Sequence, residues 1–156
     1  MKIIMKKKVI ITITVLVMLI MAFTILLPSV ILTRINNILG SLEEYEGHIE
    51  DVDLNILKGA YAIKNLEIKK RGQNVPVPFI TVLEIYATLD WRSLFKGKIV
   101  SSILINIPNI YLVQGPTKET SQYGKGVDWL QVVKDLTPIE VNVFEIKQGN
   151  IYFKTF

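Results

Sequence analysis

The sequence contains no cysteine and a single histidine, His48. The lack of cysteine excludes a disulfide scaffold, a thiol nucleophile and a cysteine-ligated zinc site. One histidine cannot supply a metal centre that needs several, nor a mechanism that passes protons between histidines. Charged residues are also few, at 21%, and the mean hydropathy is +0.38. A chain this apolar is not disordered, so contact with a membrane is the first hypothesis to examine.

The excess of positive charge is confined to the N-terminus. Of the 18 lysines and arginines, four lie in the first eight positions: Lys2, Lys6, Lys7 and Lys8. From Arg34 onward the 14 remaining basic residues are balanced by 14 acidic ones, so that part is formally neutral. A neutral domain offers no basic surface for a phosphate backbone, and we expect no nucleic-acid partner.

A long uncharged run follows the lysines. Residues 9–27 contain no charged side chain. As a helix they would measure about 28 Å, close to the roughly 30 Å of a bilayer's hydrocarbon core. The alternative is a cleaved signal peptide, but that has a shorter apolar run and a small-residue cleavage site, which this run lacks. The lysine excess before the run predicts a cytoplasmic tail over residues 1–8 and a single-pass anchor over residues 9–32.

The segment after Pro28 has the apolar spacing of an amphipathic helix. Its apolar positions are Ile31, Ile35, Ile38, Leu39 and Leu42. Pro28 is predicted to kink the anchor or to begin this second helix. We assign residues 33–46 to a juxtamembrane amphipathic helix and linker. It lies at the membrane interface or plugs one end of the following sheet, or it simply packs on the domain.

From Gly47 onward the apolar period changes to two, which is typical of strands. Turns are predicted at Lys58-Gly59, Pro108-Asn109 and Gln148-Gly149, and a phase slip at Lys64-Asn65 indicates a bulge. Seven strands and one or two short helical turns, at residues 91–95 and 127–136, result. We predict a mainly β fold with an N-terminal transmembrane helix, built as an antiparallel meander with one apolar face.

Several motifs in this order resemble a known family. They are the opening LGSLEEYEGHIEDVDLNILKGAYAIKNLEIKK, the Trp91-Arg92-Ser93-Leu94 unit before the Gly97 turn, the I-x-x-P-x-I-x-L unit around Pro108, and Gly126-Val127-Asp128-Trp129. With the anchor, they resemble the N-terminal region of bacterial AsmA-like proteins, in the branch related to AsmA and TamB that carries a domain of unknown function. The resemblance implies an inner-membrane anchor and a periplasmic, taco-like β-groove that carries phospholipids. Family members are several times longer, so we expect residues 47–156 to be an incomplete module.

The period-two pattern also predicts which side chains face the groove. The candidate lipid-facing residues are Leu54, Ile56, Leu83, Ile85, Ile103, Ile105, Val141 and Val143. The expected partners are membrane lipids, with acyl chains in the groove. The alternative is a scaffolding anchor that recruits a protein through the open edge strand at residues 151–156, since an unpaired apolar strand invites pairing.

No constellation of residues predicts catalysis. The acidic run at residues 43–53 does not match an EF-hand loop, and His48 has no nucleophile beside it in the sequence. The basic run at residues 69–71 either contacts lipid headgroups or is a solvated hairpin end. We therefore expect no enzyme activity, no metal and no cofactor.

Overall fold

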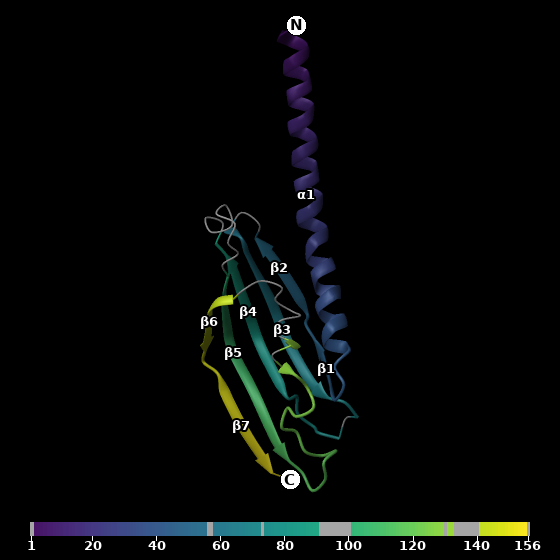
Figure 1. Cartoon of the computed structure of the whole chain (residues 1–156), viewed down its shortest axis with the longest axis vertical. Coiled ribbons are helices and arrows are strands. Elements are labelled where there is room, and N and C mark those ends of the chain that lie inside the picture. The colour runs from purple at the N-terminus through teal and green to yellow at the C-terminus, as the bar shows by residue number, and fades with distance from the viewer. Residues whose placement is uncertain are drawn as a thin grey trace.

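The computed structural model describes residues 2–55, 58–72, 74–90, 101–129, 131–132 and 141–155. One long helix stands beside a single mixed sheet and extends well beyond it (Figure 1). This confirms the predicted fold class, mainly β with an N-terminal apolar helix. The predicted helical turn at residues 91–95 lies outside the described residues.

Helix α1 spans Lys2–Gly40 without interruption. Its part from Lys7 to Gly40 is long and apolar enough to cross a membrane, and it is the one such helix in the described part of the chain. Pro28 lies inside the helix and does not end it, so the prediction of a separate second helix is wrong. Ile35 and Leu39 near the C-terminal end are buried in the core. The lower part of α1 therefore packs on the folded domain, as the second alternative had it.

The strands form one sheet in the order β1-β3-β4-β5-β6, with β2 also paired to β3 and β7 also paired to β5. Their bounds are β1 Tyr45–His48, β2 Asp51–Asn55, β3 Ala60–Lys70, β4 Ile80–Leu89, β5 Ser101–Gln114, β6 Val141–Lys147 and β7 Asn150–Thr155. Strands β1 to β5 pair antiparallel. The predicted turn at Lys58-Gly59 joins β2 to β3 and is confirmed.

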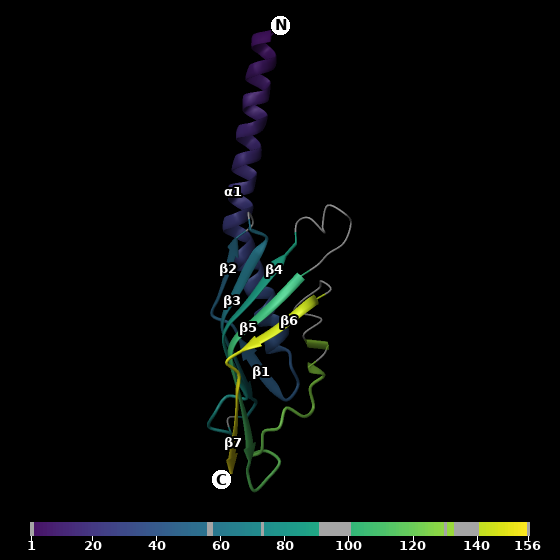
Figure 2. The ribbon, with the colours of Figure 1, turned by 90° about the vertical axis from the view of Figure 1, so that its left-hand side faces the viewer.

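Two predicted turns do not reverse the chain. β5 continues through Pro108-Asn109 as one strand, with Pro108 opposite Val82 and Asn109 opposite Thr81. The ladder is interrupted one residue earlier, at Ile107, and a proline is tolerated beside such an irregularity. β6 and β7 do not form a hairpin at Gln148-Gly149 but follow one another along β5, both parallel to it. Residues 115–140 supply the long crossover that a parallel pair requires. Figure 2 shows β6 and β7 as one path that changes direction between the two strands.

The irregularities form one line across the sheet, which we call the crease. Asn65 of β3 and Ile107 of β5 have positive φ angles of 52° and 51°, and the registers place both opposite Leu83 of β4. Gln148, between β6 and β7, has a φ of 55° and follows Lys147, which pairs with Asn106. The predicted change of phase at Lys64-Asn65 is found, and it belongs to a feature that crosses the sheet. The bulge predicted there is wrong, because Lys64 pairs with Glu84 and Leu66 with Val82 in one unchanged register.

The crease changes the spacing of successive core-facing residues from two to three, since Ile63 is followed in the core cluster by Leu66 and then by Ile68. Ile63 and Ile68 both pack in the core although an unbroken strand would place them on opposite faces, and the same holds for Ile80 and Ile85. The registers bring Ile105 and Ile110 of β5 opposite Ile85 and Ile80. Each of these strands therefore carries an Ile-x-x-x-x-Ile unit centred on the crease.

Candidate functional site

The core lies on one face of the sheet and is covered from two sides. Ile35 and Leu39 of α1 cover β1 and β2, while Trp129 and Val132 of the crossover reach the same cluster. Gly47 permits the close approach of α1, since a Cβ at this position would lie 3.0 Å from the Leu39 Cβ. The middle of the sheet is closed in this way.

Three aromatic rings hold the crossover in place. Tyr45, Phe79 and Trp129 pack with ring centroids 5.0 to 5.6 Å apart. The Gly124 N–H donates to the Tyr45 hydroxyl at 2.9 Å, and the Trp129 Nε1–H donates to the Gly124 carbonyl at 2.8 Å. Burial raises the pKa of Tyr45, the Gly124 hydrogen bond opposes this rise, and the nearby Glu44 carboxylate adds to it. The cluster has a structural role and leaves no space for a ligand between its rings.

The core face continues uncovered onto the last two strands. Phe144 and Ile146 pair with Ile103 and Ile105 of β5, so they lie on the core face. Beyond the crease, Ile151 and Phe153 pair with Ile110 and Leu112, which also contact the core. The exposed fractions are 54%, 56%, 61% and 80% for Phe144, Ile146, Ile151 and Phe153. We call these four residues the apolar strip.

Four of the eight predicted groove residues lie on the core face of the sheet. Ile85 and Ile105 are directly opposite each other on the core face, and Ile103 pairs with Ala87 in the next row. Leu54 pairs with Tyr61 of β3, which contacts the core. These four positions are half-buried or buried. They form the floor that leads to the apolar strip.

The face assigned to Leu83 and Val143 is wrong. Leu83 lies on the crease, is 55% exposed and lines a depression on the opposite face with Glu67, Thr81 and Asn109. Val143 pairs with Ser102, one residue out of phase with the core-facing Ile103. The register shift between Ser101 and Ser102 causes this change of phase and leaves Val141 beside Ser101. Ile56 lies outside the described residues.

The residues that sequence reasoning missed are those of the apolar strip. Period-two reasoning started from Val141 and Val143 and therefore excluded Phe144 and Ile146. The signal that could have found them is the spacing Ile146-Lys-Gln-Gly-Asn-Ile151. It repeats the five-residue interval of Ile63–Ile68, Ile80–Ile85 and Ile105–Ile110, and so predicts the same face and the same crease.

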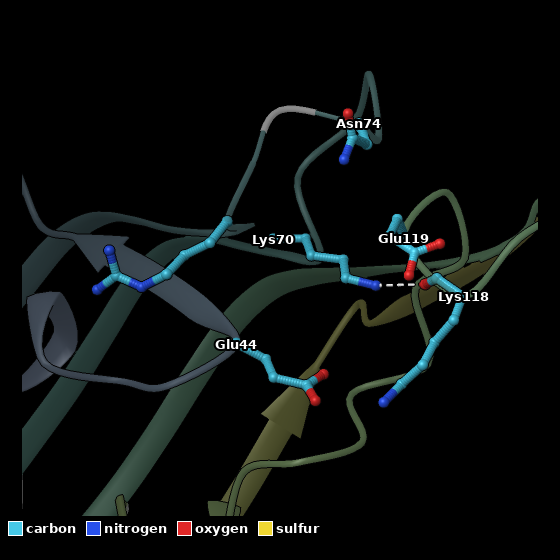
Figure 3. Close-up of a pocket in the computed structure, with 6 residues that line it drawn as sticks. Glu44, Lys70, Asn74, Lys118 and Glu119 are labelled. Carbon is cyan, nitrogen blue, oxygen red and sulfur yellow. Dashed lines mark hydrogen bonds between the residues drawn. The ribbon is translucent and has the colours of Figure 1, made fainter.

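A charged pocket of about 240 Å³ lies at the end of the sheet away from the helix N-terminus (Figure 3). Lys70 Nζ donates to the carbonyls of Lys118 and Ser121 at 2.7 and 2.6 Å. Arg71 donates to the carbonyls of Gly40 and Leu42 at the end of α1 and pairs with Glu46 at 3.5 Å. These cations are engaged in holding loops and the helix end.

A second hollow, the depression at the crease, contains the one histidine of the chain. The depression at the crease, of about 540 Å³, contains His48, Glu50 and Glu67. Among the described parts of the chain no three His, Cys, Asp or Glu side chains are grouped to hold a metal ion. His48 pairs in register with Glu67 in the β1–β3 ladder.

In comparisons with protein-family models, with curated proteins and with solved structures, nothing matches this chain. The resemblance to AsmA-like proteins therefore stays a hypothesis based on its motifs.

Proposed function

We propose that this chain is a membrane-anchored β-groove module that holds acyl chains and contributes to phospholipid transfer or envelope assembly. The apolar strip supports this proposal most directly. It runs from Phe144 to Phe153, about 30 Å of strand at roughly 3.3 Å per residue, with its side chains exposed on the core face. Each methylene that leaves water for such a surface gains about 0.8 kcal/mol, so no single residue needs to carry the affinity.

The proposed location is a bacterial inner membrane, with α1 as a single-pass anchor and the sheet in the periplasm. Apolar side chains are exposed all around α1 from Val9 to Leu26, which is typical of a helix in lipid. Lys2, Lys6, Lys7 and Lys8 set the orientation. Alkaline phosphatase fused after Phe156 should be active, and replacing the four lysines by glutamate should scramble the orientation. An inactive fusion of the unchanged chain would overturn the assignment.

Photo-crosslinking tests lipid binding with controls inside the same strand. A photoreactive amino acid at Phe144 or Phe153 of the full chain in membranes should capture phospholipid. The same amino acid at Glu145 or Tyr152, which point to the opposite face, should not. Equal labelling on both faces would contradict the groove, and labelling by protein instead of lipid would favour the alternative.

The alternative function is a scaffolding anchor that binds a protein strand along β6 and β7. The observation that favours it is the edge position of both strands in the described sheet, together with the exposure of every residue of β7. Backbone groups on such an edge are free to pair with another strand.

A further inference from the structure

Helix α1 runs alongside the sheet, and one contact fixes the position of the sheet along the helix axis. The Asn36 side chain donates from Nδ2 to the Ile49 carbonyl at 3.2 Å and accepts from the Ile49 N–H at 2.8 Å. Ile49 is buried and lies in the break between β1 and β2, where the ladder leaves its backbone groups without strand partners. The side-chain amide of Asn36 thus pairs with both backbone groups of Ile49 and fixes Ile49 beside Asn36 along the helix axis.

From this level β2 runs back toward the N-terminus of α1, and its end lies beside the helix (Figure 1). Asn55 is six residues beyond Ile49, which is about 20 Å of extended strand at roughly 3.3 Å per residue. The same length of helix takes about 13 residues at roughly 1.5 Å each. If β2 is inclined to the helix axis, the length of helix that it runs beside is shorter. At an inclination of about 40°, β2 still extends roughly 15 Å along the helix axis from Ile49 to Asn55.

The membrane boundary on α1 falls within this overlap. Residues 9–33 are uncharged, and a bilayer's hydrocarbon core requires about 20 of them. If the span begins at Val9, the outer boundary is near Pro28, about 12 Å from Asn36 along the helix. If it ends at Thr33, the boundary is about 5 Å from Asn36. With the span beginning at Val9, the end of β2 reaches the level of this boundary to within about 3 Å. With the span ending at Thr33, the polar Asn55 and the charged Lys58 would enter the hydrocarbon core, which is costly, so we adopt the first placement.

We infer that the turn between β2 and β3, at Lys58, lies in the headgroup layer of the membrane that α1 spans. This inference rests on the proposed anchor but not on lipid binding in the groove. The β2–β3 end of the sheet is therefore a second membrane contact, which fixes the rotation and the tilt of the sheet against the bilayer.

The charges near this end fit a lipid surface. Lys58 is exposed and forms no ion pair with a described side chain, whereas Lys64, Lys69 and Arg71, further along β3, each pair with a carboxylate. The Lys58 N–H donates to Asn55 Oδ1 at 3.1 Å, which holds the turn. Lysine near a membrane boundary reaches the phosphates of the headgroups while its stem stays in the less polar layer.

The same end of the sheet is where the apolar strip begins. Ala60 pairs with Thr88, and Leu89 of β4 pairs with Ser101 of β5. Ser101 lies beside Val141 at the start of β6, three residues before Phe144. A turn seated in the headgroups would leave about 10 Å of strand between the start of β6 and Phe144, the first residue of the strip.

The lack of cysteine makes a depth measurement direct. Single-cysteine variants K58C, E119C and T33C of the full chain would carry an environment-sensitive nitrobenzoxadiazole label in phosphatidylcholine–phosphatidylglycerol vesicles. A nitroxide on the lipid headgroup quenches labels at that depth. We expect the label at position 58 to be quenched several-fold more than the label at position 119, and about as strongly as the label at position 33.

Two other outcomes would overturn the inference and are distinguishable. Quenching at position 33 but not at position 58 would show that the helix is anchored while the sheet stands clear of the bilayer. No quenching at either position would show that α1 does not span the membrane, which removes the premise as well. Crosslinking of lipid at Phe144 is measured separately, so the groove can fail while the contact at Lys58 holds.

Discussion

At the scale of single residues, Gly47 decides how closely α1 approaches the sheet. A Cβ at this position would lie 3.0 Å from the Leu39 Cβ and 3.2 Å from the Ile68 Cγ1. Gly47→Ala should therefore lower the free energy of unfolding by about 1–3 kcal/mol, because the helix must move or the side chains must leave their rotamers. Denaturant unfolding of the full chain in detergent measures this loss.

Gly40 provides the matched control. It lies in the last turn of α1, and an added Cβ would have nothing within 4 Å. Gly40→Ala should leave the free energy of unfolding unchanged or raise it by about 0.5–1 kcal/mol through the helix propensity of alanine. Equal losses in both variants would show that close packing is not what Gly47 supplies.

Asn36 should matter more than its neighbour Asn37. Asn36→Ala removes both hydrogen bonds to Ile49 and leaves a buried backbone N–H and C=O without partners. We expect a loss of about 1–3 kcal/mol in the free energy of unfolding. Asn37 is exposed, and Asn37→Ala should cost little. A small effect of both substitutions would mean that water replaces the amide at the break.

Tyr45 should make the fold sensitive to alkaline pH. Burial raises its pKa above the usual value of about 10, so its contribution to stability is complete below pH 10 and is lost as the pH rises through the higher pKa. Tyr45→Phe should cost about 1 kcal/mol at neutral pH through the lost Gly124 hydrogen bond.

Denaturant unfolding between pH 8 and pH 11 tests this dependence on Tyr45. The variant should lose less stability than the unchanged chain over this range. It should keep a residual slope, because burial raises the pKa of Tyr61 as well. Identical slopes in both proteins would refute the assignment to Tyr45.

At the scale of elements, the crease places residues with side chains in a backbone region that glycine prefers. Gln148 has a φ of 55°, and its side chain is exposed. Gln148→Gly should raise the free energy of unfolding by about 0.5–1 kcal/mol, whereas Gln148→Val should lower it by about 1 kcal/mol, since β-branched residues fit this region worst. Thermal unfolding of the pair measures the difference, and an opposite ranking would show that the bend at β6–β7 is not held in that conformation.

Much of the element pattern was readable from the sequence. The uncharged run predicted α1, alternation from Val52 onward predicted the strands, and the Lys64-Asn65 slip marked the crease in β3. The turn predicted at Pro108-Asn109 was wrong. A proline followed by asparagine is typical of a turn, but a strand also tolerates proline next to an irregular position. The parallel pairing of β6 and β7 has no local signal, since it depends on where residues 115–140 lead the chain.

Prediction of the face on which each candidate groove residue lies depended on an unbroken alternation of side chains along its strand. Ile85, Ile103 and Ile105 were assigned correctly because they lie on one side of the crease, in regular ladders. Leu83 failed because it lies on the crease, and Val143 failed because a register shift at Ser101 precedes it. One extra residue turns every later side chain to the other face, so an error at one position spreads along the strand.

At the scale of the whole molecule, the exposed edge strand should govern association. Phe153 is 80% exposed on β7. Phe153→Ser should leave the free energy of unfolding nearly unchanged and reduce the self-association of the full chain in detergent, because the side chain contributes to an apolar surface but not to the core. Light scattering and denaturant unfolding together measure this. Unchanged association would show that other surfaces drive it.

The crease also has a mechanical meaning. A sheet resists bending least along a line where its ladders are interrupted, so β1 to β7 behave as two stiff facets joined at a flexible axis. Asn36 holds Ile49 in the β1–β2 break, which lies on this axis. On the lower facet, β1 is held to the helix, because Gly47 packs closely on Leu39 and Arg71 donates to the carbonyls of Gly40 and Leu42. Force applied to β7, which lies away from the strands that pack on α1, would change the angle between the facets there before it disturbed the part beside α1.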